Sequence, residues 1–133
     1  MQARLVAATI ALVLITAPHA LEDFHYGDLS RLGIAPPAGV AILASAYALQ
    51  LIGIVLTWRG RRSGPAILGV MGAVWCVGAL VIHGHDLLFA GPDYRHGLVS
   101  KALEVLIIAL GAVCAVLGAL SVRSVSTRTA TPR

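Results

Sequence analysis

Residues 65–89 read PAILGVMGAVWCVGALVIHGHDLLF, an apolar, glycine-containing run that ends in two histidines and an aspartate. A helix that crosses a bilayer needs about 20 predominantly apolar residues, and this run is long enough. Pro65 stands where a helix start tolerates proline, because the first turn has no internal partner for its backbone nitrogen. The run therefore predicts a transmembrane helix with a polar end.

Three other runs in the sequence have the same apolar character. Each reaches the length of a bilayer span, and the short connections make consecutive helices antiparallel neighbours. We therefore predict an all-α integral membrane protein, an antiparallel four-transmembrane-helix bundle in a single domain of residues 1–122. The polar segment 123–133 is predicted to be a disordered tail. The remaining spans are predicted at about residues 5–23, 38–58 and 100–122.

The composition agrees with a membrane protein. Hydrophobic residues make up 58% of the 133 residues, and charged residues make up 12%, against about 25% in an ordinary soluble domain. The net charge of +4 comes from short basic clusters beside the spans, so nucleic acid is not an expected partner. Asparagine is absent and lysine occurs once, as in proteins from GC-rich bacterial genomes. We predict a multi-pass protein of the bacterial cytoplasmic (inner) membrane.

The basic residues divide unevenly between the two ends of the predicted bundle. Seven of the ten basic residues lie on one side, and the positive-inside rule makes that side cytoplasmic. Both termini and the RGRR stretch at 59–62 then lie in the cytoplasm, with Trp58 as an interfacial anchor. On that side are Arg4, Arg59, Arg61, Arg62, Arg123, Arg128 and Arg133, and on the other are Arg31, Arg95 and Lys101.

The first predicted span also has features of a signal peptide, namely Arg4, an apolar stretch and then small residues. The candidate cleavage site, APHA at 17–20, has Pro18 and His19 where small residues are expected. We therefore predict that this span is retained as a helix.

The titratable groups gather at the outer end of the predicted bundle. The positive-inside rule accounts for the basic residues, but not for histidines or for acids set inside the helix ends. A polar layer is therefore expected on that side. Its acidic residues are Glu22, Asp23, Asp28, Asp86, Asp93 and Glu104, and its histidines are His19, His25, His83, His85 and His96.

Small residues mark the faces through which the third and fourth spans are expected to pack. They recur at alternating spacings of three and four, which places them on one face of each helix, and helices in lipid pack closely through such faces. The two cysteines can either remain small buried thiols or form a disulfide, and we favour the thiols. The packing residues are Gly69, Gly72, Cys76, Gly111, Cys114 and Gly118.

Two spans that run in the same direction each carry a His-x-x-carboxylate pair near the outer end. Residues i and i+3 are neighbours on a helix surface, and metal sites in helical bundles are built from such pairs on facing helices. We predict His83 to face inward and His85 to lie at the outer rim, since they are about 200° apart around the helix. The predicted ligands are His19, Glu22, His83, Asp86 and Glu104, and possible additional ligands are Asp23, His25, His85 and His96.

Imidazole and carboxylate ligands suit a divalent transition metal such as Zn, Fe or Mn. A b-type haem between His19 and His83 ranks below a simple metal site, and c-type attachment is not expected because no CxxCH motif occurs. The alternative is a structural cap in which Asp86 or Glu104 pairs with Lys101 or Arg95. Proton handling by the same groups is a third reading.

Three functional hypotheses follow. The first is a small binding protein with an outward-facing divalent-metal or proton-responsive site. The second is an accessory or assembly subunit of a larger membrane complex, in which the polar layer is purely structural. The third is a homodimeric transporter or membrane redox protein. No nucleophile–base arrangement occurs, so the enzyme class is the less favoured one. Partners are expected to be the bilayer and either further copies of the chain or a larger complex.

Overall fold

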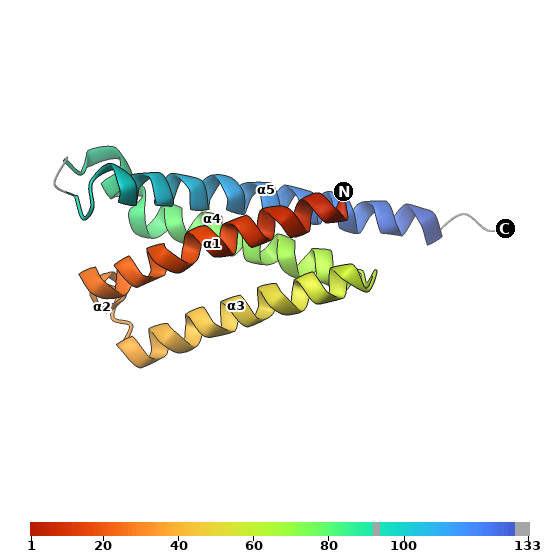
Figure 1. The fold of residues 1–133 in the computed structure, drawn as a ribbon, viewed down its shortest axis with the longest axis horizontal. Coiled ribbons are helices and arrows are strands. Elements are labelled where there is room, and N and C mark those ends of the chain that lie inside the picture. The colour runs from red at the N-terminus through yellow and green to blue at the C-terminus, as the bar shows by residue number, and fades with distance from the viewer. Residues whose placement is uncertain (92–93, 130–133) are drawn as a thin grey trace.

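The computed structural model describes residues 1–91 and 94–129. Across these residues the chain is helical and contains no strand. Four of its helices are long and apolar enough to cross a membrane. They run alongside one another, with the start of α1 and the end of α5 at one end of the molecule and α2 at the other (Figure 1). The helices are α1 (Gln2–Tyr26), α2 (Asp28–Arg31), α3 (Pro36–Trp58), α4 (Ser63–Phe89) and α5 (Leu98–Thr129).

The long helices coincide with the predicted spans and extend each by a few residues. Gly27 ends α1 with a left-handed φ of 73°, a conformation that glycine adopts without steric cost. Pro36 occupies the first turn of α3, where proline is well tolerated. The predicted disordered tail is partly wrong, because α5 continues to Thr129. Residues 123–131 contain no proline, so no helix-breaking proline ends the helix at residue 122.

The closest helix contact joins α4 and α5 through glycine. A Cβ atom added at Gly72 would lie 2.5 Å from the Cβ atom of Cys114 and 2.7 Å from the carbonyl oxygen of Gly111. One added at Gly118 would lie 2.5 Å from the Cα atom of Gly69. These backbones approach so closely that a methyl group does not fit, as in small-residue helix packing within lipid.

The remaining helices pack around this pair. The Thr9 hydroxyl of α1 lies 3.7 Å from the Sγ atom of Cys114 in α5. The indole nitrogen of Trp75 in α4 donates a hydrogen bond of 3.2 Å to the Oε1 atom of Gln50 in α3. Both cysteines are free thiols, as favoured from the sequence. Cys76 contributes its backbone nitrogen and Cβ atom to the contact at Gly111.

Polarity in this bundle is arranged as expected for a protein surrounded by lipid. Leu14, Leu51 and Val81 are exposed on the outside of the helices. By contrast, Thr9 and Gln50 are fully buried between helices. Helices in lipid pack through small and polar side chains and present apolar ones to the acyl chains. The buried polar groups are therefore the ones that specify which faces meet.

We expect Gly72→Ala to lower the free energy of unfolding by about 1–3 kcal/mol, because the added methyl group overpacks the α4–α5 contact. Gly78→Ala is the matched control in the same helix. A Cβ atom there meets nothing within 4 Å, so the better helix propensity of alanine should leave stability unchanged or higher. Thermal unfolding of the detergent-solubilised variants measures both. Equal stability of the two variants would contradict glycine-mediated packing.

Candidate functional site

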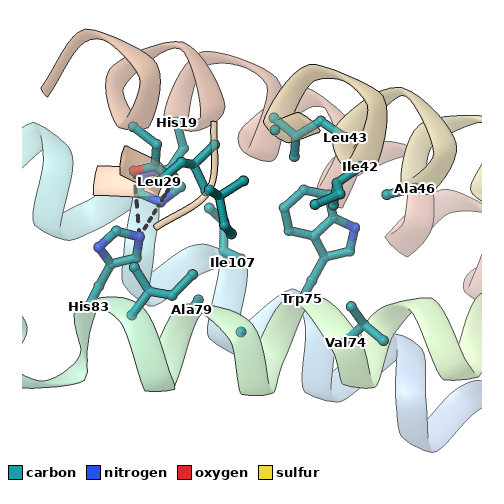
Figure 2. Close-up of a pocket in the computed structure, with 15 residues that line it drawn as sticks. His19, Leu29, Ile42, Leu43, Ala46, Val74, Trp75, Ala79, His83 and Ile107 are labelled. Atoms are coloured by element: carbon teal, nitrogen blue, oxygen red, sulfur yellow. Dashed lines mark hydrogen bonds and ion pairs between the residues drawn. The ribbon is translucent and has the colours of Figure 1, made fainter. Parts of the chain in front are cut away.

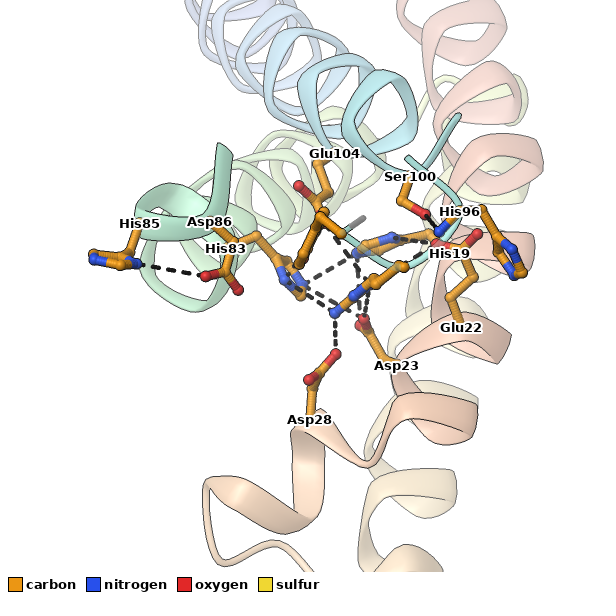
Figure 3. Close-up of polar contacts among 12 residues, drawn as sticks. His19, Glu22, Asp23, Asp28, His83, His85, Asp86, His96, Ser100 and Glu104 are labelled. Carbon is orange, nitrogen blue, oxygen red and sulfur yellow. Dashed lines mark hydrogen bonds and ion pairs between the residues drawn. The ribbon is translucent and has the colours of Figure 1, made fainter. Parts of the chain in front are cut away.

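Buried titratable side chains gather at the end of the bundle where α1 and α4 finish and α5 begins. His19, His83 and Glu104 are all buried there, although they come from three helices. The left-handed turn at Gly27 then places Asp28 of α2 beside them, and Asp28 is also buried. Figure 3 shows these side chains pointing toward one another. The α4–α5 contact sets the depth at which His83 and Glu104 meet.

The centre of this group is formed by His19, Asp23 and His83. The Nε2 atoms of the two histidines are 3.2 Å apart. One oxygen of Asp23 lies 3.5 Å from the Nε2 atom of His83, and the other lies 3.6 Å from the Nε2 atom of His19. One ligand atom from each residue can be chosen so that all three lie within 4.8 Å of one another. We refer to these three residues as the His/Asp triad.

The spacing of the triad can be compared with that of metal ligands. Ligands bonded at about 2.0–2.2 Å in a tetrahedral site lie about 3.3–3.6 Å apart. The two Nε2 atoms are 3.2 Å apart, but the 3.5 and 3.6 Å contacts of Asp23 use its two different oxygens, and ligand atoms taken one per residue lie within 4.8 Å of one another. The triad therefore has the donor types of a metal site, and its side chains must move to bring one oxygen of Asp23 to tetrahedral spacing from both nitrogens.

Arg95 joins the acidic residues from three helices. Its side chain is only 4% exposed, and its Nη1 atom lies 3.0 Å from Asp23, 3.8 Å from Glu22 and 3.7 Å from Glu104. Its Nη2 atom donates to Asp28 and lies 3.4 Å from the Nδ1 atom of His83. Burial alone would lower the pKa of Arg95, but Asp23 and the neighbouring anionic groups outweigh it and raise that pKa.

The loop that carries Arg95 is shaped for this contact. Arg95 has a left-handed φ of 45°, which is unusual for a residue with a side chain. Tyr94 beside it donates a hydrogen bond of 2.8 Å from its hydroxyl to the Oε1 atom of Glu104. Burial and this bond to Glu104 raise the pKa of Tyr94, so its hydroxyl remains a donor. The rings of Tyr26 and Tyr94 lie within 6 Å of the guanidinium.

The charges of this network do not balance. All four carboxylates contact Arg95, and Arg31 adds a second guanidinium, 3.0 Å from Asp28. With the carboxylates ionised and the imidazoles neutral, two negative charges remain. Unpaired charge in a low-dielectric interior is costly, so two protons or one divalent cation would stabilise the site. The four carboxylates are those of Glu22, Asp23, Asp28 and Glu104.

The predicted ligands are only partly brought together. Glu22 lies 3.9 Å from the Nδ1 atom of His19, and Glu104 lies 3.7 Å from the Nδ1 atom of His83, so both border the triad. Asp86 does not join it. Its side chain is 40% exposed and lies 3.4 Å from His85, which is itself 81% exposed at the rim, as expected. Asp86 is nearer the end of α4 than His83, and its carboxylate turns toward the surface.

Of the possible additional ligands, Asp23 belongs to the triad. His25 and His96 are exposed, and each ring is in edge-to-face contact with the ring of Tyr26. Asp93 lies outside the described residues. Helical spacing alone does not separate Glu22 from Asp23 as a ligand, because Asp23 is i+4 from His19 and is an equally valid surface neighbour.

Sequence reasoning did not find the central role of Arg95, Tyr94 and Asp28. The sequence predicts Arg95 only as a partner of Asp86 or Glu104 in a structural cap. Its Nη1 atom does lie 3.7 Å from Glu104. Lys101 donates instead to the carbonyl oxygen of Ala90. The signal that could have pointed to Arg95 is its position in a short loop directly before the acid-bearing helix.

The two imidazole rings are in edge-to-face contact, with centroids 4.8 Å apart.

Comparison with known proteins gives limited guidance. No protein-family model matches the chain, and no solved structure matches it. A curated protein from Beijerinckia indica, named 4-hydroxy-tetrahydrodipicolinate reductase, is 34% identical over 102 residues. That match covers 73% of this chain, but the chain spans only 36% of the length of that relative.

We expect Arg95→Gln to lower the free energy of unfolding by about 3–5 kcal/mol, because it leaves buried carboxylates without their cation. Arg31→Gln is the control, since the Arg31 side chain is 73% exposed and pairs only at the edge of the network. That loss should be about 0–1 kcal/mol. Thermal unfolding in detergent at pH 7.5 measures both variants. An Arg95 variant as stable as the Arg31 variant would contradict a central structural role for Arg95.

Proposed function

We propose that this chain is a small binding protein of the bacterial cytoplasmic membrane that holds a divalent transition metal at the His/Asp triad. The charge of the surrounding network carries this proposal. With its carboxylates ionised and its imidazoles neutral, the network holds two uncompensated negative charges, and one divalent cation would neutralise both. The donor types of the triad, with one ligand atom per residue lying within 4.8 Å of the others, support it independently.

The chemistry of the donors limits the metal. Two imidazole nitrogens and one carboxylate favour Zn, Fe or Mn, and thiolate-seeking metals such as Cu(I) are disfavoured. Glu22 and Glu104 lie beside the Nδ1 atoms of His19 and His83, away from the Nε2 atoms that face Asp23, so they border the ligands rather than the metal position. Each has one buried oxygen without a hydrogen-bond partner. A buried acceptor of this kind is costly unless it gains a partner, and a proton would satisfy it.

Arg95 has a supporting role in this proposal. Its hydrogen bond of 3.0 Å to Asp23 orients that carboxylate toward the histidines. Partners of this kind fix the orientation of metal ligands in many proteins. Because the guanidinium is a cation, it also lowers the affinity of the triad for metal. This predicts reversible metal binding rather than a tightly held structural ion.

The distribution of basic residues supports a triad that faces the outside of the cytoplasmic membrane. The four apolar helices and the lipid-like exposure of their leucines and valines support insertion. The reductase activity in the name of the Beijerinckia protein is not carried over to this chain, because the match covers only 36% of that protein.

The first test is elemental analysis of the detergent-solubilised protein after its affinity tag is removed. After incubation with Zn, Mn or Fe(II) and desalting, we expect about one ion per chain. His83→Ala and Asp23→Asn should lose it, because each removes a triad ligand. His85→Ala should retain it, since His85 is exposed and outside the triad. Equal metal content in His83→Ala and the unchanged protein would refute the site. No metal in any sample would favour the structural cap.

Metal binding should weaken at acidic pH, because imidazole nitrogens bind metals only when unprotonated. Protons would then supply the positive charge that the metal supplied. Calorimetric titration between pH 7.5 and 5.0 measures this loss, and binding should release protons into the buffer. Affinity that does not change over this range would exclude the histidines as ligands. The titratable and charged groups facing the site are Glu22, Asp23 and His19 of α1, Asp28 of α2, His83 of α4, Tyr94 and Arg95 of the loop, and Glu104 of α5.

A further inference from the structure

An apolar cavity of about 220 Å³ lies between α1, α3 and α4 and ends on the His/Asp triad. Figure 2 shows the imidazoles of His19 and His83 at one end and the indole of Trp75 toward the other. The wall between these ends is almost entirely apolar. A cavity with an apolar body and a few convergent polar groups is typical of a small-molecule site.

Small residues create this space. Gly78 lines the cavity, and a Cβ atom built on it would meet nothing within 4 Å. Ala46 of α3 and Ala79 of α4 line it as well. Ile42 and Val74, which also line it, are both more than half exposed on the outside of the bundle. The cavity therefore extends to the face that the bundle presents to lipid, and a ligand can enter from the bilayer.

The polar end restricts the occupant. The network around it has two more carboxylates than guanidinium groups, so a fatty acid or an anionic lipid headgroup would be repelled. An imidazole N–H can donate to a carbonyl oxygen, and an unprotonated imidazole or Asp23 can accept from a hydroxyl. The group that fits there is uncharged and carries a carbonyl or hydroxyl oxygen.

The opposite end favours a planar ring. Trp75 presents an indole to the cavity, and its orientation is held by the hydrogen bond to Gln50. Aromatic side chains stack favourably on flat conjugated rings. An acyl chain has neither a polar group to contact the His/Asp triad nor a flat ring to stack on Trp75.

We propose that this cavity binds a membrane-borne quinone or quinol. The ring lies between the His/Asp triad and Trp75, with one ring oxygen toward His83 or His19, and the apolar tail leaves past Ile42 and Val74 into the bilayer. This inference goes beyond the metal site. It shares the polar end with that site, but it rests on the cavity walls and is tested on metal-free protein.

The test uses the fluorescence of Trp75 in a Trp58→Phe background, because Trp58 is the other tryptophan of the chain. Protein treated with a chelator is placed in nanodiscs and titrated with decylubiquinone, a soluble quinone that quenches indole fluorescence. We expect saturable quenching. Gly78→Leu should weaken the apparent affinity at least tenfold, since its side chain fills open space in the cavity.

Gly84→Leu is the matched control. Gly84 lies in the same helix and also has open space for a side chain, but it does not line the cavity. The apparent quinone affinity of Gly84→Leu should equal that of the parent protein. Ala46→Leu fills the cavity from α3 and should reproduce the loss. It is the second variant if Gly78→Leu shows reduced helicity by circular dichroism.

Competition identifies the ligand class. Neutral monoolein and palmitate should not displace the quinone, and His83→Ala should weaken quinone binding at least tenfold. Quenching that does not saturate, or that is equal in Gly78→Leu and Gly84→Leu, would overturn the proposal. Displacement by monoolein or palmitate at equal concentration would assign the cavity to lipid instead. Gly78→Leu should still bind metal, so the metal site and the quinone site can fail independently.

Discussion

The guanidinium of Arg95 is the group on which the polar end of this protein depends. Four largely buried carboxylates from α1, α2 and α5 lie around it. Without a buried cation their mutual repulsion would separate the helix ends. Because a single guanidinium offers five N–H donors in a planar fork, it can serve carboxylates from different helices at once. With the carboxylates ionised and the imidazoles neutral, two negative charges stay uncompensated, and a divalent cation or two protons would balance them.

The packing of the apolar part places these groups. At Gly72 and Gly111 the backbones of α4 and α5 meet without intervening side chains. This contact fixes how far the two helices are shifted along each other, so that His83 of one and Glu104 of the other lie within 3.7 Å. Helix packing in lipid has little hydrophobic driving force. Close backbone contact therefore sets the register of α4 against α5, and the buried polar pairs stabilise that register.

The same polar end serves both proposed ligands. A metal ion at the triad would use its nitrogen and oxygen atoms from the side of the network, whereas a quinone would approach along the apolar cavity. Gly78 leaves open space where a side chain would lie, and Ala46 and Ala79 also line the cavity. The proposals thus depend on different features of the bundle, one on charge and the other on space, although they meet at His19 and His83.

Local properties of the sequence determined the four apolar helices, the small-residue faces of α4 and α5, and the inward direction of His83, because length, apolar character and helical spacing need no knowledge of distant residues. The sequence also placed His19 and Glu104 at the same end. Only the tertiary structure decided that Asp23 rather than Asp86 completes the triad and that Arg95 lies at the centre. Those outcomes depend on how each helix is rotated about its axis and on a loop with positive φ at Arg95, and both are set by contacts between residues as far apart as 23 and 95.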